Sequence, residues 1–351
     1  MDYFSQLDNP NHTFVIAEAG SNWKCGSYED DLKQGIDLIK TAAKAGSDAV
    51  KFQTYRPESV YVKDAGKSKY LSKSGINEDV FQLFSKLSMP YEMIPELSAC
   101  CKKYNICFMS TPFSVQDVDQ IDPYVKIHKI ASYEINHVRL IKAMISKNKP
   151  IILSTGASTL EEIDFAVNIL KEKKDIKFAL MQCTAKYPAP IDSMNLSVIP
   201  LLKKRYNIPI GLSDHSIDPI ISPLIAIGMN ATIIEKHFTL DRNLEGPDHQ
   251  FALNPNELKL MVESIRMADK TKGNGKKEIL DIEKELHQFA TRSLQAIKNN
   301  KKGEILVEGE NFDVLRPGNK KRGLDARKLD TVNGKKAIND ISLGDGIEDF
   351  E

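Results

Sequence analysis

Two histidines stand near the ends of apolar runs in the second half of the chain. His215 lies in GLSDHS (211–216) and His237 lies in TIIEKHF (232–238). A single histidine at such a place is commonly a hydrogen-bonded core or loop residue. Two imidazoles at matching strand ends instead suit manganese, iron, cobalt or zinc, with water or substrate oxygens completing an open, catalytic coordination shell. The pair therefore predicts a metal site.

Two lysines and a set of small hydroxyl residues end other apolar runs. The lysines are Lys51, in DAVKFQT, and Lys129, in KIHKIAS. The hydroxyl residues at corresponding places are Ser110, Thr111, Ser132, Ser154 and Ser213. Ammonium groups with neutral donors predict a site for phosphate or carboxylate. Lysines that extend to solvent at a rim, hydroxyls that cap helices, and a lysine that forms a Schiff base in a barrel aldolase are the alternatives.

The other residues at the ends of these runs carry an unusual amount of charge for positions that flank a core. They include Glu18, Gln53, Glu134, Gln182, Thr184, Asp214, Glu235 and Lys236. Burial of a charge without a partner is costly, so we expect these groups to face one another or a ligand.

The elements that would position these side chains alternate regularly. Eight β-rich runs are FVIAEAG (14–20), DAVKFQT (48–54), ICFMST (106–111), KIHKIAS (126–132), PIILSTG (150–156), FALMQCT (178–184), PIGLSD (209–214) and ATIIEKHF (231–238). Segments of helical period separate most of them, and we predict a C-cap at Gly46 and a capping box of Thr159 with Glu162. The pattern predicts an α/β fold, a (β/α)8 TIM barrel with catalytic groups at the carboxyl ends of its strands. An open doubly wound sheet is the alternative, although EAGSNWKCG is a poor dinucleotide-binding fingerprint.

The character of the sequence changes near residue 270. We predict a barrel domain over 1–270, a charged linker over 271–288 and a small β-rich module over 289–351, where short β runs alternate with glycine turns. A length of 351 residues agrees with two domains, at ~150 residues per domain.

Composition favours a soluble globular protein. Lys plus Arg and Asp plus Glu both number 48, so the formal net charge is zero and no nucleic-acid partner is expected. The five cysteines lack the spacing of a disulfide pair or a zinc finger. No signal-peptide pattern or membrane-length apolar run is evident, so we expect a reduced, cytoplasmic protein with no membrane partner.

Nine motifs occur in order along the chain: IAEAGSN, AVKFQTY, FMSTPFS, HKIASYE, IILSTG, GLSDHS, EKHFT, GPDH and LRPGN. Together they strongly resemble the sialic acid (N-acetylneuraminate) synthase family. The resemblance covers essentially the whole chain, and it identifies the last module as similar to that family's antifreeze-protein-like (SAF, β-clip) domain.

The resemblance implies a transferase that forms a carbon–carbon bond. Such enzymes condense phosphoenolpyruvate with an N-acylated aldose, either N-acetylmannosamine or a 2,4-diacetamido-dideoxy hexose. The product is a nine-carbon 2-keto acid of the sialic or legionaminic acid type, and phosphate leaves. A pseudaminic acid synthase of the same family and a Schiff-base barrel aldolase are the alternatives. The resemblance also implies a divalent metal, typically Mn²⁺ with Co²⁺ or Mg²⁺ as other choices, and a homodimer with a domain-swapped C-terminal module.

The resemblance further implies a role for individual residues. The metal ligands match His215 and His237. The phosphoenolpyruvate site matches Lys51, Thr111, Lys129, Ser132, Ser154 and Ser213. The sugar site matches Glu18, Gln53, Glu134, Tyr187 and Asp248, with Arg316 contributed by the other subunit. Of the carboxylates, Glu134 is the expected group that orients water or moves a proton, and Glu18 is the second choice.

Two positions depart from the family pattern near the expected sugar pocket. Trp23 stands where most members carry His, and Ala185 stands where members related to the neuraminate enzyme often carry Asn. These departures leave the metal and phosphoenolpyruvate residues intact but leave the acceptor sugar open. Trp23 either shapes the pocket or simply packs at the barrel mouth.

Overall fold

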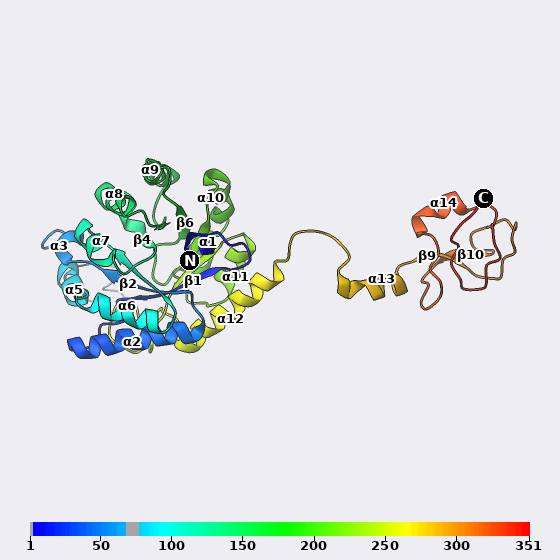
Figure 1. The fold of residues 1–351 in the computed structure, drawn as a ribbon. Helices are drawn as coiled ribbons and strands as arrows, with labels where there is room; N and C mark the ends of the chain where they lie inside the picture. The colour runs from blue at the N-terminus through cyan, green and yellow to red at the C-terminus, as the bar shows by residue number, and fades with distance from the viewer. Residues whose placement is uncertain (1–2, 68–76) are drawn as a thin grey trace. The chain divides into compact units, whose positions relative to one another are not determined.

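The computed structural model describes residues 3–67 and 77–351. The chain divides into two compact units, Met1–Gly273 and Asn274–Glu351, which are described separately (Figure 1). Among the described residues, no helix combines the length and apolarity needed to cross a bilayer.

Eight parallel strands form the centre of the first unit (Figure 1). They are β1 (Phe14–Gly20), β2 (Ala49–Thr54), β3 (Cys107–Pro112), β4 (His128–Ile130), β5 (Ile151–Ser154), β6 (Phe178–Cys183), β7 (Ile210–Asp214) and β8 (Ile233–His237). β1 pairs with both β2 and β8, and β3 lies against β4, so the sheet closes into a ring. The predicted (β/α)8 barrel is confirmed, and the open doubly wound sheet is excluded because the first and last strands pair.

Helices surround this ring. They are α1 (Tyr3–Leu7), α2 (Tyr28–Ala45), α3 (Pro57–Val60), α5 (Val80–Leu87), α6 (Met93–Lys103), α7 (Val115–Ile121), α8 (Val138–Ser146), α9 (Leu160–Lys171), α10 (Val198–Tyr206), α11 (Ile221–Gly228) and α12 (Pro255–Thr271). The predicted helix signals are confirmed: Gly46 caps α2 with φ 86°, and Thr159 forms a capping box with Glu162 at the start of α9. Such caps satisfy backbone groups that a helix terminus leaves unpaired.

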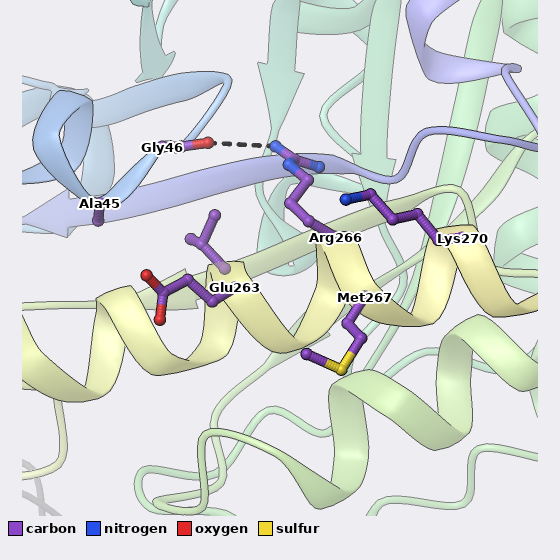
Figure 2. Close-up of a pocket in the computed structure, with 7 residues that line it drawn as sticks. Ala45, Gly46, Glu263, Arg266, Met267 and Lys270 are labelled. Carbon is purple, nitrogen blue, oxygen red and sulfur yellow. Dashed lines mark hydrogen bonds between the residues drawn. The ribbon is translucent and has the colours of Figure 1, made fainter.

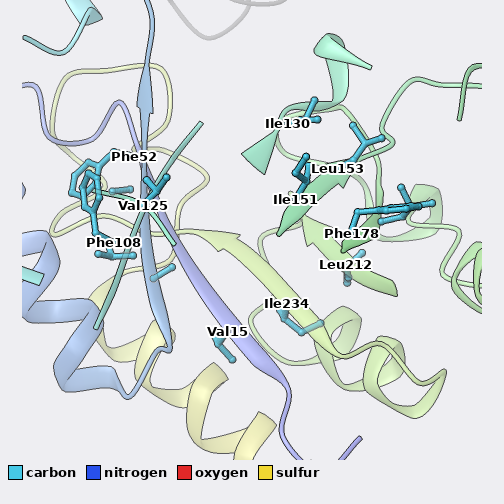
Figure 3. Packing of buried hydrophobic residues seen from close by; sticks show 14 of the residues in the cluster. Val15, Phe52, Phe108, Val125, Ile130, Ile151, Leu153, Phe178, Leu212 and Ile234 are labelled. Atoms are coloured by element: carbon cyan, nitrogen blue, oxygen red, sulfur yellow. The ribbon is translucent and has the colours of Figure 1, made fainter. Parts of the chain in front are cut away.

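Side-chain alternation along the strands separates two cores. Residues that face outward, including Val15, Phe52 and Ile234, pack against the helices (Figure 3). Residues that face inward near the strand starts are apolar, and Phe14, Ile16 and Leu7 of α1 belong to this inner cluster. Because the inner cluster fills the lower half of the barrel, polar inward-facing residues are confined to the upper half, at the carboxyl ends of the strands.

The second unit has a small core of its own. β9 (Ser293–Ala296) pairs antiparallel with β10 (Phe312–Leu315), and Leu294 and Phe312 anchor an apolar cluster. The helical elements are η3 (Asp281–Glu283), α13 (Lys284–Ala290), η4 (Ala326–Lys328) and α14 (Leu329–Val332). Part of the stretch 271–288 is therefore helical, and Gly318 N donates to Phe289 O at 3.0 Å, which ties α13 to this unit.

Candidate active site

The carboxyl ends of the strands bring the predicted polar residues together inside the barrel. Glu18 on β1 is in register with Lys51 on β2 and with His237 on β8, so these three side chains share one face. The inward-facing polar residues that are buried include Glu18, Lys51, Thr111, Lys129, Ser154, Ser213, Glu235 and His237. Except for Ser213, which follows Gly211, each lies two or four residues after an apolar residue of the inner cluster, as the two-residue period of a strand requires.

The two predicted lysines form a buried ionic cluster with two carboxylates. Lys51 Nζ lies 2.5 Å from Glu18 Oε2 and donates to Thr111 Oγ1 at 3.1 Å. Lys129 Nζ donates to Ser154 Oγ at 2.7 Å. Each of these two ammonium groups also lies 3.7 Å from the same oxygen, Oε1 of Glu235.

Burial and charge act against each other in this cluster. Burial raises the pKa of Glu18 to about 7 even though Lys51 opposes the shift. Burial alone would lower the pKa of Lys51, but Glu18 and Glu235 outweigh it and raise that pKa. Burial lowers the pKa of Lys129, and Glu235 only partly compensates. The cluster is therefore close to charge balance in a medium where unpaired charge is costly.

Ser132 and Ser213 complete the residues predicted for phosphoenolpyruvate. Ser213 Oγ donates to Glu235 Oε1 at 3.2 Å, and Ser132 Oγ accepts from Gly156 N at 2.9 Å. A Cβ on Gly156 would lie 2.9 Å from both Ser132 Oγ and Cys183 Sγ, so only glycine fits at this contact. The structure thus gathers the whole predicted set at one end of the barrel.

His215 and His237 lie side by side, with ring centroids 5.7 Å apart. Two imidazoles that bind one ion through nitrogens ~2.1 Å from it have centroids roughly 5–6 Å apart. His215 Nδ1 donates to Thr184 O at 2.9 Å, which is the outer-shell bond typical of ligating histidines, and His237 Nδ1 is buried without a hydrogen-bond partner among the described residues. Burial lowers the pKa of both rings to about 3, so both are neutral.

These features fit a divalent ion held by two neutral imidazoles. Within the described ranges, no group of three or more His, Cys, Asp or Glu is arranged as a ready metal cluster. Water or substrate oxygens would therefore have to supply the remaining ligands of an ion bound here.

An aromatic wall covers the histidine pair. Tyr187 stacks on His215 with ring centroids 4.1 Å apart, and Phe251 lies 5.1 Å from His237 and 5.2 Å from Tyr187. Tyr187 follows β6, and Phe251 lies in the loop after β8. The rings keep water from one side of the pair and lower the local dielectric constant.

Gln53 and Asp248, both predicted for the sugar, are each held by a residue at the end of β1 or directly after it. Gln53 Nε2 donates to Glu18 Oε1 at 3.0 Å. Asp248 Oδ2 accepts from the backbone N of Ser21 at 3.1 Å and from its Oγ at 2.9 Å. A Cβ on Gly20, whose φ is 53°, would lie 2.6 Å from Asp248 Oδ2. Glycine at this position therefore allows the loop after β8 to close on the end of β1.

Glu134 lies in a turn of 3₁₀ helix, Ser132–Glu134, directly after β4. It is partly exposed, and burial raises its pKa to about 7. Arg316, in contrast, belongs to the second unit, where it directly follows β10 and is exposed.

The two departures from the family pattern have different surroundings. Trp23 is 1% exposed and belongs to the outer core, which supports the packing interpretation for this residue. Ala185 lies in the loop after β6, and its carbonyl accepts from Tyr133 Oη at 3.4 Å. Tyr133 is 63% exposed beside Glu134, and the sequence analysis did not select it.

Glu235 was among the charged strand-end residues expected to face one another or a ligand, but the sequence analysis assigned it no specific role. It shares the inward face of β8 with His237, two residues further on, and this alternation was the signal that could have placed it beside the predicted ligands. The intervening Lys236 points to the opposite face, where its Nζ lies 2.7 Å from Asp214 Oδ2. That second pair links β8 to the end of β7 and takes no part in the cluster of Glu235.

A separate shallow pocket lies at the other end of the barrel (Figure 2). It is lined by Ala45, Gly46, Val262, Glu263, Arg266, Met267 and Lys270. Arg266 donates to Gly46 O at 3.2 Å and binds Asp48 Oδ2 at 2.6 Å. Because Gly46 and Asp48 precede β2, this pocket lies at the amino ends of the strands, away from the residues described above.

Comparison with known proteins identifies the family of this chain. The sequence profile of the NeuB family matches residues 38–277. The chain is 39% identical over 329 residues to the N,N'-diacetyllegionaminic acid synthase of Campylobacter jejuni, covering 93% of this chain and 96% of that one. It is 37% identical over 341 residues to a pseudaminic acid synthase of the same species, covering 96% of both. The crystal structure of N-acetylneuraminic acid synthetase from Leptospira borgpetersenii, in complex with citrate, matches at a TM-score of 0.69 and 35% identity, over 80% of this chain and 92% of that one. The chain belongs to the NeuB family.

Proposed function

We propose that this enzyme condenses phosphoenolpyruvate with an N-acylated aldose to give a nine-carbon 2-keto acid and phosphate. The observation that carries the proposal is the buried pair Lys51 and Lys129, lined with hydroxyl groups, at the same barrel end as the neutral pair His215 and His237. Relatives named as legionaminic and pseudaminic acid synthases support it.

The lysine pair binds the anionic substrate. The ammonium groups of Lys51 and Lys129 neutralise its phosphate and carboxylate, which repel each other in a dry pocket. Thr111, Ser132, Ser154 and Ser213 supply neutral donors around them. No lysine adduct is required, because phosphoenolpyruvate is already an activated enol.

His215 and His237 bind a divalent ion in this proposal, Mn²⁺ first and Co²⁺ or Mg²⁺ as alternatives. Such an ion, when bound, polarises the carbonyl oxygen of the open-chain sugar. Their neutral state at working pH leaves lone pairs available without competition from protons.

Glu134 moves a proton or orients the water that attacks C2 of the pyruvyl group. A group whose pKa is about 7 is half ionised near neutral pH, which suits this task. Glu18 is the less suitable carboxylate because Lys51 and Gln53 already engage both of its oxygens. Gln53, Tyr187 and Asp248 line the space for the sugar.

The acceptor is N-acetylmannosamine or a 2,4-diacetamido-dideoxy hexose. The relatives reported above are named for different acids, so similarity alone does not choose between a legionaminic and a pseudaminic acid product. We further propose a cytoplasmic homodimer in which residues 289–351 act as an antifreeze-protein-like domain. In this dimer Arg316 of one subunit binds the acyl group of the sugar held by the other.

A substrate panel tests the proposal. The purified chain is incubated with Mn²⁺, phosphoenolpyruvate and each 2-acylamino sugar, and phosphate release is followed together with the product mass. We expect one phosphate per molecule of 2-keto acid and inhibition by EDTA. A lysine adduct trapped by borohydride with pyruvate, with no effect of EDTA, would instead support the aldolase.

A further inference from the structure

Glu235 occupies the centre of the anion site. Its Oε1 lies 3.7 Å from Lys51 Nζ and 3.7 Å from Lys129 Nζ, and it accepts from Ser213 Oγ at 3.2 Å. The side chain is 7% exposed. Its three partners are all residues that we propose to bind phosphoenolpyruvate, so the carboxylate of Glu235 and the substrate anion compete for the same hydrogen-bond donors.

Without substrate, carboxylates of the protein itself neutralise the positive charge of the lysine pair. Glu18 and Glu235 balance the charges of Lys51 and Lys129. An ammonium group has three donor hydrogens, and Glu18, Thr111 and Glu235 surround that of Lys51. An incoming phosphate can bind the lysines fully only if one carboxylate withdraws.

Glu235 is held less firmly than Glu18. Glu18 accepts from Gln53 Nε2 at 3.0 Å through one oxygen and pairs with Lys51 Nζ at 2.5 Å through the other. Glu235 has its contacts through Oε1, and its Oε2 is buried without a hydrogen-bond partner among the described residues. Glu18 Oε2 likewise lacks a hydrogen bond, but its 2.5 Å ion pair with Lys51 Nζ holds it in place. A carboxylate with one unsatisfied buried oxygen gains most by moving when a competing anion arrives.

We propose that Glu235 is a positioning residue that serves as an internal counter-anion of the lysine pair. It holds Lys51 and Lys129 in place before the substrate binds, and it moves away when the substrate phosphate binds them. After the reaction it pairs with the two lysines again, which weakens their binding of the released phosphate. This inference rests on the proposed function, because it assumes that the lysine pair binds the phosphate of the substrate.

Binding of inorganic phosphate to Glu235→Gln tests the proposal. Titration calorimetry in EDTA keeps metal out of the measurement, and phosphoenolpyruvate serves as a second titrant. Removal of one negative charge beside two ammonium groups should tighten phosphate binding roughly tenfold. The charge-retaining Glu235→Asp should bind phosphate more weakly than Glu235→Gln. Unchanged or weaker binding to Glu235→Gln would overturn the proposal, because a merely structural role predicts loss of affinity.

Asp117→Asn is the matched control. Asp117 is also a fully buried carboxylate, but its partners are Tyr91 and Ser114, so its loss should leave phosphate affinity unchanged. If Glu235→Gln does not fold, a crystal structure of the wild-type chain with phosphate replaces it. Glu235 Oε1 should then lie beyond 4 Å from both Nζ atoms, and a carboxylate that keeps both contacts beside bound phosphate would overturn the proposal.

The inference and the proposed function can fail separately. Turnover of the wild-type chain on the sugar panel decides the function. The ratio of phosphate affinities between Glu235→Gln and the wild-type chain decides the role of Glu235, whatever the acceptor sugar proves to be.

Discussion

At the scale of single residues, burial decides the protonation state of the groups that would do the chemistry. It keeps His215 and His237 neutral and raises the pKa of Glu134 to about 7. The neutral imidazoles can therefore bind a cation through their lone pairs, and the carboxylate of Glu134 can take up or release a proton near neutral pH. In water, Glu134 would be ionised at neutral pH, and a fraction of each imidazole would be protonated.

His215→Ala should remove a metal ligand while leaving the barrel folded. Turnover should fall at least about a hundredfold, since loss of an outer-shell partner alone typically costs 10–100-fold. Manganese content after dialysis should fall in parallel, as measured by atomic absorption. The circular dichroism spectrum should be retained, because the residue stands just after β7 and outside its ladder. Full activity with unchanged metal content would contradict the assignment.

Glu134 should impose a pH dependence on stability. Its pKa is raised in the folded chain, so the folded state binds more protons than the unfolded state between about 4.5 and 7, and stability falls as pH rises through that window. Glu134→Gln should lack this contribution and gain in melting temperature relative to the wild-type chain as pH increases from 5 to 8. Thermal melts of both proteins across this range provide the measurement. Parallel curves would show that Glu134 titrates normally.

At the scale of elements, Gly156 sets how closely the loop after β5 approaches the turn after β4. Gly156→Ala places a Cβ 2.9 Å from Ser132 Oγ and Cys183 Sγ, so the turn after β4 must move. The KM for phosphoenolpyruvate should rise roughly tenfold, at a cost of about 1–3 kcal/mol in stability from overpacking. Steady-state kinetics and chemical denaturation measure the two effects.

Gly228→Ala is the control for this substitution. A Cβ at Gly228, the last residue of α11, meets no atom within 4 Å, so kinetics and stability should stay near wild type. Equal effects of the two substitutions would show that the close contact at Gly156 has no specific role.

The elements were largely predictable because each strand is a short β-rich run and segments of helical period separate most of these runs. The runs in which β1, β2 and β8 form were identified with their inward polar ends, and the caps of α2 and α9 followed from local hydrogen-bonding chemistry. The run 126–132 was too long, since β4 spans only His128–Ile130 and Ser132 begins a 3₁₀ turn. The local sequence pattern does not determine the residue at which the hydrogen bonding of a strand to its neighbours ends.

Contacts between strands were less accessible to sequence reasoning. The position of Glu235 between Lys51 and Lys129 depends on how β8, β2 and β4 meet across a closed ring, and no local pattern encodes that geometry. The burial of Trp23 in the outer core likewise depends on how its loop folds against the helices. The residue types of the site were predictable, and several of their partners were not.

At the scale of the whole molecule, the residues predicted for the sugar are divided between the two compact units. Arg316 belongs to the second unit and the others belong to the first. In the proposed dimer its guanidinium binds the acyl group of the sugar, so Arg316→Ala should raise the KM for the sugar roughly tenfold and change that for phosphoenolpyruvate little. Initial rates with each substrate varied in turn measure both constants. Equal changes in the two constants would contradict the assignment to the acceptor.

Complementation tests the domain swap itself. If the proposed dimer forms, co-expressed His215→Ala and Arg316→Ala chains pair in part as mixed dimers, and in a swapped mixed dimer one barrel has both an intact histidine pair and an intact arginine. With sugar well below its KM, where Arg316→Ala alone is about tenfold less active, activity should recover to about a quarter of wild type when chains pair at random. Mixtures no more active than Arg316→Ala alone would show that each barrel uses its own Arg316.

The most direct measurement of the central claim is an anomalous difference map from crystals of this chain soaked with Mn²⁺ and phosphoenolpyruvate. The account predicts a manganese peak between the rings of His215 and His237, and a phosphate bound by Lys51 and Lys129. Imidazole rings that point apart with no ion between them, or a phosphate bound elsewhere on the barrel, would contradict it.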